Sequence, residues 1–407
     1  MVFRQPARTR ALAAIGVVAA LGLAACSSSS KSSTSSNTTA SGGGGSTATT
    51  ASGGGAASSG TTLKLGFFGA LTGANAQLGI NIEDGEKLAV SQYNATNPSV
   101  KVTVDPFDSQ GSPAQANNGA TKLINDKVVA VIGPAFSGES AAADPIFEAA
   151  SVPNVSASAT NVKLAQHGFK FFHRALAADD AQGKGDADYL VKTLNLKTLA
   201  VIDDSSVYGK GLADVLRTNV SSNGGQIVLN DHIDPNGADY GSTVNKIVAA
   251  KPAGVFFGGY YDAAGRLINQ LRSAGYKGQF MSGDGSEDSH FIKDAGGAPA
   301  AGAYLSCACA DATKLPGAQA FVSAYRAAYG TPPAIYSGEA YDATNFILAA
   351  IKSGATTPSA INSYLQSNSD NGVTKTMKFE PDGNVSGGTI YVYQVKNGQI
   401  VQIGTTS

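Results

Sequence analysis

Polar and aromatic residues stand directly after several apolar segments of this chain of 407 residues. The segment "VVAVIG" (128–133) is followed by "PAFSGES", and "VPNVS" (152–156) is followed by "ASAT". Further along, Tyr208, Tyr260 and Asp284 each come shortly after an apolar segment. Hydroxyl groups and the free N–H groups at a helix start can hold a carboxylate, whereas an acid beside aromatic rings suits an ammonium group. The two sets together are complementary to a zwitterion.

Each set also has an ordinary structural explanation. Ser137 and Gly138 precede a helix that we expect to start near Glu139, and serine is a common N-cap residue. Ser156 to Thr160 would also be compatible with a plain polar loop. An aromatic or acidic residue after three of the later apolar segments is harder to explain by loop chemistry alone. A binding site and simple capping both remain open at this point.

Short apolar segments alternate with longer amphipathic ones from Thr62 onward, which is typical of alternating strands and helices. Strands are expected at 63–68, 100–104, 128–133 and 152–156, and then at 198–203, 225–230, 253–259 and 278–283. The first helices are expected at Ile80–Tyr93, Pro113–Asp126 and Glu139–Ala150. The last segment, "TMKFEPDGNVSGGTIYVYQV" (376–395), is interpreted as two strands joined by a turn-rich loop.

This order predicts parallel sheets with helices on both faces. The strands form two groups of four that separate near Asp179, so we expect two α/β lobes. In open sheets of this kind ligands bind at the carboxyl ends of strands, and here in a cleft between the lobes. The candidate binding residues stand at those strand ends.

The amino terminus resembles an export signal. Arg4, Arg8 and Arg10 precede an uncharged apolar run at 11–25, which is shorter than the roughly 20 residues of a membrane-spanning helix. The run ends in "LAAC", with Cys26 last, and this resembles the signal of bacterial lipoproteins. That resemblance implies cleavage before Cys26 and lipid attachment to its thiol, and more than one acyl chain anchors a protein durably. The alternative is a secreted protein with an incidental cysteine.

The next segment is predicted to be a tether. Ser27 to Thr61 contains nothing more apolar than alanine and a single charged residue, Lys31, so it cannot bury enough surface to fold. The whole chain has a formal net charge of −1 and no long basic run, and nothing in it indicates nucleic-acid binding.

Two cysteines, Cys307 and Cys309, follow in "LSCACAD". A disulfide, two free thiols and a metal site are all conceivable, but a metal normally needs further ligands, and the four histidines are scattered. Neither a Gly-x-Ser-x-Gly elbow nor a phosphate-binding loop occurs in the body, and no histidine has a visible nucleophile partner. We therefore expect no enzyme, no cofactor and no metal.

Six motifs resemble one known family. They are "GALTGANAQLG" (69–79), "VIGPAFSGES" (131–140), "SASAT" (156–160), "YGKGLA" (208–213), "GGYYDAAG" (258–265) and "GQFMSGDG" (278–285). In this order, between Leu63 and Tyr393, they resemble the type I periplasmic binding proteins of ABC transporters, in the branch that includes the leucine/isoleucine/valine-binding protein. The resemblance implies two doubly wound α/β lobes with parallel sheets, joined by a hinge with three crossings.

The resemblance also implies a ligand site. It assigns carboxylate binding to Ser137, Ser158 and Thr160, and ammonium binding to Asp284, with Thr160 nearby. The remaining implied contacts are Leu78, Ala135, Phe136, Tyr208, Tyr260 and Gly285. Leu78 stands where the family often has tyrosine, Phe136 is bulky, and Asp284 is one carbon shorter than the family's glutamate. These differences leave the predicted site for the amino-acid headgroup intact. They do not support the prediction that the ligand has a branched side chain. We expect Asp284 to lack an obligatory partner until ligand binds.

These inferences combine into one prediction. The chain is expected to be a monomeric, extracytoplasmic lipoprotein, anchored to the cell membrane, that captures an amino acid or a related small zwitterion or amide for an ABC permease. The alternative is a sensory module that presents the solute to a membrane receptor. Expected parts are a signal at 1–25, a tether at 26–61, a first lobe at 62–179 and 311–376, and a second lobe at 180–310 and 377–407. The hinge crossings are expected near Asp179, near Cys307 to Asp311, and near Thr376.

Overall fold

The computed structural model describes residues 60–406. The predicted signal peptide, Cys26 and nearly all of the tether lie outside these residues. Within the described part no helix combines the length and the apolar character that crossing a membrane requires.

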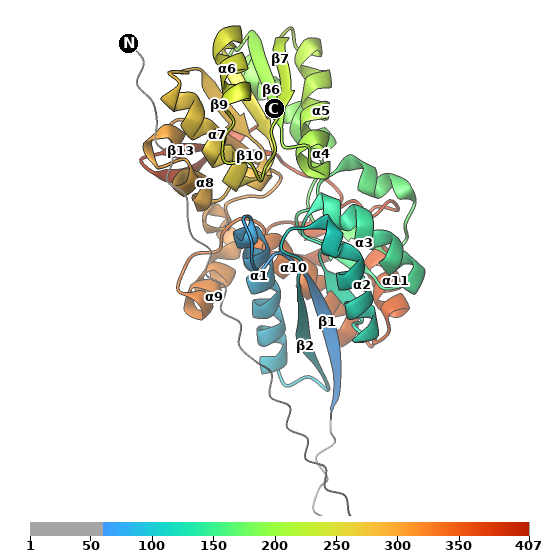
Figure 1. Ribbon diagram of the computed structural model, residues 1–407. Coiled ribbons are helices and arrows are strands. Elements are labelled where there is room, and N and C mark those ends of the chain that lie inside the picture. The colour runs from blue at the N-terminus through green and yellow to red at the C-terminus, as the bar shows by residue number, and fades with distance from the viewer. Residues whose placement is uncertain (1–59, 407) are drawn as a thin grey trace, which may run out of the picture. The chain divides into compact units, whose positions relative to one another are not determined.

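The first lobe is built on a sheet of five parallel strands, with the order β2-β1-β3-β4-β5. Figure 1 shows its first two strands, β1 and β2, side by side. Its strands are β1 (Thr61–Gly69), β2 (Val100–Asp108), β3 (Ala130–Ile132), β4 (Asn154–Ser156) and β5 (Phe172–Arg174). The helices of this lobe are α1 (Ala76–Ala95), α2 (Ala116–Asn125), α3 (Ser137–Ala150), α9 (Gln319–Tyr329), α10 (Ser337–Lys352) and α11 (Pro358–Ser367). Four of the strands were predicted; β5 was not, because its three residues include a histidine and an arginine.

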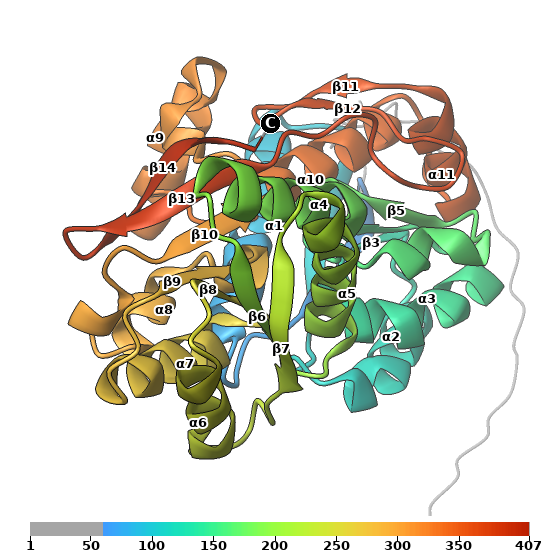
Figure 2. The same cartoon turned by 90° about the horizontal axis from the view of Figure 1, so that it is seen from above.

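The second lobe has a seven-stranded sheet with the order β14-β13-β10-β9-β8-β6-β7. Its parallel strands are β6 (Thr198–Asp203), β7 (Gln226–His232), β8 (Gly254–Gly258), β9 (Gln279–Ser282) and β10 (Tyr304–Cys307). Its helices are α4 (Asp179–Asp188), α5 (Val207–Ser222), α6 (Gly241–Ala250), α7 (Tyr261–Ser273) and α8 (Ser289–Asp294). An antiparallel hairpin of β13 (Tyr391–Lys396) and β14 (Gln399–Thr405) extends this sheet beyond β10 (Figure 2).

The central strands of both sheets are buried on both faces, which explains their continuous apolar runs. Successive side chains of a strand point to opposite faces. In β1, Phe67 packs in the cluster that contains α1 and α10, while Phe68 packs against α2 and α3. In β8, Phe256 packs against Leu212 and the rest of α5, while Phe257 joins the cluster that contains α7. The prediction of two α/β lobes with helix-covered parallel sheets is confirmed.

The third crossing between the lobes lies later than the sequence predicted. The backbone N–H of Arg174 donates to the carbonyl of Gly383 at 2.9 Å, and Arg174 Nε donates to Asn384 Oδ1 at 2.5 Å. The ring of Phe379 packs against that of His173 at a tilt of 32°, with ring centroids 4.6 Å apart. The chain therefore stays with the first lobe well beyond Thr376, because these residues complete the packing around β5.

The segment 376–395 contains two strands joined by a loop, as predicted, but the two strands do not pair with each other. Its first part, β12 (Thr376–Met377), pairs with β11 (Asp370–Asn371), and β13 pairs with β10 and β14. The β13–β14 turn contains Asn397 and Gly398, both at positive φ (52° and 74°), as a tight hairpin turn requires. This Asn-Gly pair was the sequence signal for the hairpin.

Candidate ligand-binding cleft

The carboxyl ends of strands from both sheets border a small cavity of about 10 Å³, which is about the room for one water molecule. Its lining residues are Leu78, Ala135, Phe136, Ser137, Ser158, Tyr208, Tyr260, Asp284 and Tyr336. All but Tyr336 were candidates from the sequence. Of the remaining candidates, Gly285 directly follows the lining residue Asp284, and Thr160 lies two positions after the lining residue Ser158.

On the first lobe, Ser137 is the first residue of α3, not its N-cap. The N-cap is Phe136, whose backbone N–H donates to Glu139 Oε2 at 3.3 Å. The hydroxyl oxygen of Ser137 instead accepts the backbone N–H of Asn161 at 3.3 Å. The capping explanation for Ser137 is therefore wrong, and its hydroxyl sits at the positive end of a fourteen-residue helix.

The loop after β4 contributes two hydroxyl groups with different surroundings. Ser158 donates to the carbonyl of Ala135 at 2.5 Å, which ties this loop to the one before α3. Thr160 is fully buried, and its hydroxyl makes no hydrogen bond among the described residues. Thr160 does not itself line the cavity, and its hydroxyl acts on the carboxyl group of Asp179, whose pKa it lowers.

On the second lobe, Tyr208 holds the acidic end of the site in place. Its hydroxyl donates to Asp284 Oδ1 at 2.7 Å and accepts the backbone N–H of Gly285 at 2.9 Å. A Cβ atom on Gly285 would lie 2.7 Å from the ring of Tyr208 and 2.9 Å from that of Tyr260, so only glycine fits there. The Tyr208 and Tyr260 rings are 5.1 Å apart.

Asp284 is buried and carries two hydrogen bonds without ligand. Besides Tyr208, the hydroxyl of Tyr336 donates to Asp284 Oδ2 at 2.6 Å. Burial raises the pKa of Asp284, and the two phenol hydrogen bonds oppose that rise. Asp284 is expected to lack an obligatory partner when the cleft is open; in this closed arrangement it has two protein partners, Tyr208 and Tyr336.

A second buried acid, Asp179, lies close to this site, and the sequence had marked it only as a hinge position. Its backbone N–H donates to the carbonyl of Thr160 at 2.9 Å, and its carboxyl oxygens make no hydrogen bond among the described residues. Burial, followed by the charge of Asp284, raises the pKa of Asp179 to about 8, although the Thr160 hydroxyl lowers it. The charge of Asp179 also raises the pKa values of Tyr208 and Tyr260. The site therefore contains two mutually repelling acids.

The lobes touch directly around the cavity. Asn161 Nδ2 of the first lobe donates to the carbonyl of Val207 in the second at 2.7 Å. The backbone N–H of Gln77 donates to the hydroxyl of Tyr261 at 3.3 Å across the same gap. The cleft is thus in a closed arrangement.

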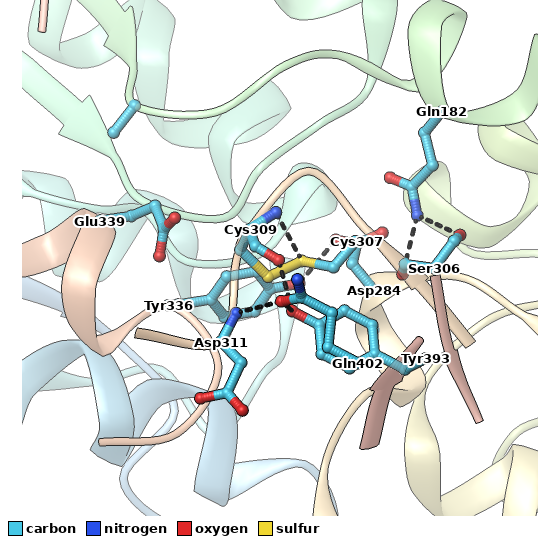
Figure 3. Close-up of a disulfide and its surroundings, with 12 residues drawn as sticks. Gln182, Asp284, Ser306, Cys307, Cys309, Asp311, Tyr336, Glu339, Tyr393 and Gln402 are labelled. Atoms are coloured by element: carbon cyan, nitrogen blue, oxygen red, sulfur yellow. Dashed lines mark hydrogen bonds between the residues drawn. A yellow bond between two sulfur atoms is a disulfide. The ribbon is translucent and has the colours of Figure 1, made fainter. Parts of the chain in front are cut away.

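The second crossing, after β10, contains a disulfide between Cys307 and Cys309 (Figure 3). The hydroxyl of Tyr393 donates to the carbonyl of Cys309 at 2.6 Å, which fixes this bend to β13. Of the three alternatives for these cysteines, the structure has the disulfide. Among the described residues no group of histidine, cysteine and acidic side chains is arranged to hold a metal.

Comparisons with known proteins agree with this geometry. A family model described as periplasmic binding protein matches residues 62–399. An amino acid binding protein of Pseudomonas aeruginosa is 30% identical over 334 residues, covering 81% of this chain and 89% of that protein. The leucine-specific-binding protein of Salmonella typhimurium is 28% identical over 335 residues, covering 82% and 90%. A crystal structure of a branched-chain amino acid transporter substrate binding protein of Streptococcus pneumoniae, in complex with isoleucine, superimposes with a TM-score of 0.79 at 29% identity, covering 84% of this chain and 100% of that one.

Proposed function

The chain belongs to the periplasmic binding protein family, whose members bind solutes for transporters and are not enzymes, and from this premise we propose that its cleft captures an amino acid or a related small zwitterion or amide. One observation carries the proposal. Ser137 at the start of α3 stands on one wall of the cavity, together with Ser158, and Asp284 stands on the opposite wall of the same cavity.

The two opposite walls of the cavity bind different groups of the ligand. A ligand carboxylate is held by the N-terminal end of α3, with the Ser137 hydroxyl and Thr160 nearby. The ligand ammonium pairs with Asp284, and the nearby Asp179, whose pKa burial raises to about 8, is a second acid beside this site. Such a ligand contacts both lobes, so it binds the closed form more tightly than the open form and shifts the population toward closure.

We further propose that the protein is a lipoprotein anchored through Cys26 and that it delivers its solute to an ABC permease. The apolar run before Cys26 and the uncharged Ser/Gly-rich segment after it support the anchor. The family match supports the transport partner.

A thermal-shift screen tests the proposed ligand class. The chain from Ser27 onward is mixed with each of the twenty amino acids, with small amides and with polyamines. A ligand present at 100 times its dissociation constant adds about 2.7 kcal/mol to the free energy of unfolding. Stabilisation by one or more amino acids or amides is expected. Stabilisation by polyamines alone, or by none of the compounds, contradicts the proposal.

A further inference from the structure

Tyr336 reaches the ligand site from the opposite lobe. It immediately precedes α10, which packs against α1 and β3 of the first lobe, whereas Asp284 follows β9 in the second sheet. Their hydrogen bond of 2.6 Å therefore joins the two lobes, and both side chains are buried (Figure 3).

Resting on the proposed function, we propose that Tyr336 is an internal competitor for Asp284: its hydroxyl occupies the position of the ligand ammonium, holds the empty cleft closed and thereby sets the ligand affinity. Two features of the site support this role. The first is that one oxygen of Asp284 can exchange its hydrogen-bond donor. The second is the space next to Tyr336 into which its ring moves.

The two oxygens of Asp284 differ in this respect. Tyr208, on Oδ1, belongs to the same lobe and is itself fixed by the Gly285 N–H, so it stays in place when the lobes separate. Tyr336, on Oδ2, belongs to the other lobe and leaves when the cleft opens. Oδ2 is therefore the position open to exchange. An ammonium group forms a charge-assisted hydrogen bond, roughly twice as strong as that of a neutral phenol, so it can replace Tyr336.

The structure also leaves room for the displaced ring. Tyr336 has a φ of 66°, a conformation that bulky residues rarely adopt. The segment just before it, 331–335, lines a separate groove of about 1030 Å³. Tyr336 itself is packed in the buried cluster that contains α10, and we infer that its ring moves toward this neighbouring groove when a ligand replaces it.

Tyr336→Phe tests the proposal, because it removes the hydroxyl and keeps the ring. Binding of L-alanine and L-leucine is measured by calorimetric titration, and the radius of gyration of the ligand-free protein by X-ray scattering. Losing one neutral hydrogen bond that competes with the ligand should tighten binding about fivefold. The ligand-free variant should also have a larger radius of gyration than the wild type. Tyr329→Phe, the same change on α9 away from the cleft, should alter neither quantity.

The outcomes separate this proposal from the proposed function. Unchanged or weaker binding by Tyr336→Phe overturns the competitor role, because a structural or ligand-holding tyrosine gives that result. If neither amino acid binds the wild type or the variant, the scattering measurement decides. A radius of gyration of ligand-free Tyr336→Phe equal to that of the wild type overturns the proposal that Tyr336 holds the cleft closed. A larger radius of gyration supports it. Failure of the proposed function shows independently, as an absence of stabilisation throughout the twenty amino acids and the amides.

Discussion

Phe136 and Tyr260 meet edge to face across the cleft, with ring centroids 5.1 Å apart and an interplanar angle of 69°. Phe136 comes from the first lobe and Tyr260 from the second, so this contact closes one side of the cavity. With Leu78 beside them in the lining, these rings leave little space beyond the headgroup site. The geometry favours a ligand with a small side chain.

Phe136→Ala should therefore change which ligand binds. Removing the ring opens the side of the cavity, so amino acids with larger side chains, such as leucine and phenylalanine, should gain affinity relative to alanine. The measurement is the thermal-shift profile of the variant against the twenty amino acids. An unaltered order of preference would show that Phe136 does not border the ligand side chain.

Asp284→Ala should weaken binding at least about thirtyfold, because removing one partner of a buried ion pair typically costs about 2–5 kcal/mol. It should also destabilise the ligand-free protein by about 1–3 kcal/mol, since the hydroxyls of Tyr208 and Tyr336 lose their acceptor. Calorimetric titration and melting curves measure the two effects. Asp284→Asn keeps an acceptor oxygen and should lose affinity with a smaller loss of stability. Normal binding by both variants would place the ammonium site elsewhere.

Asp179→Asn should make the protein less sensitive to pH. The pKa of Asp179 is about 8 in the folded protein and near its ordinary value of 3.8 when unfolded, so the folded state binds more protons between these values. Its contribution to the free energy of unfolding is full below about pH 4 and falls as the pH rises toward 8. The variant should melt like the wild type at pH 4 and higher than it at pH 8. The control is Asp180→Asn, at the exposed neighbouring position. An equal change in melting temperature in both variants would contradict the assignment of this pH dependence to Asp179.

Replacing Cys307 and Cys309 together with serine should cost little global stability. The stabilisation by a disulfide grows with the length of the loop it closes, and these cysteines are only two positions apart. We expect a melting temperature lower by a few degrees at most. A thiol assay on the unfolded chain from Ser27 onward should detect no thiol before reduction and two afterward. Two thiols without reduction would show that the bridge does not form.

Cys26→Ser should move the protein from the membrane fraction to the medium or periplasm. The residue that accepts the lipid would be gone, whereas the tether and the body would be unchanged. Fractionation followed by immunodetection measures the distribution. Undiminished membrane association of the variant would refute the lipoprotein assignment.

The sequence predicted those parts of the molecule whose pattern is local. Strands buried on both faces show as apolar runs, and the rule that ligands bind after parallel strands led to Ser137, Tyr208, Tyr260 and Asp284. Tyr336 follows no strand; it precedes a helix, and only the packing of α10 against the first sheet brings it to Asp284. The local sequence pattern could not predict this contact between Tyr336 and Asp284.

The same limit explains the errors near the carboxyl terminus. The short strand β5 is recognisable only by its partners, since Arg174 is held by Gly383 and Asn384. Because these contacts are not visible in the sequence, the segment just after Thr376 was assigned to the second lobe, although it stays with the first. The Asn397-Gly398 turn was a local signal that could have been used.

The interleaving of the two lobes along the chain also governs the order in which the molecule can assemble. Arg174 and Asn384 are 210 positions apart, and strands β6 to β10 of the second lobe are synthesised between them. Contacts between distant positions form late, because a long intervening chain must first be brought together. The strands β1 to β5 can pair early, but the first lobe is incomplete until α10 and the residues around Asn384 arrive. A chain that ends before residue 384 therefore carries every candidate ligand contact and still lacks the finished lobe that positions them.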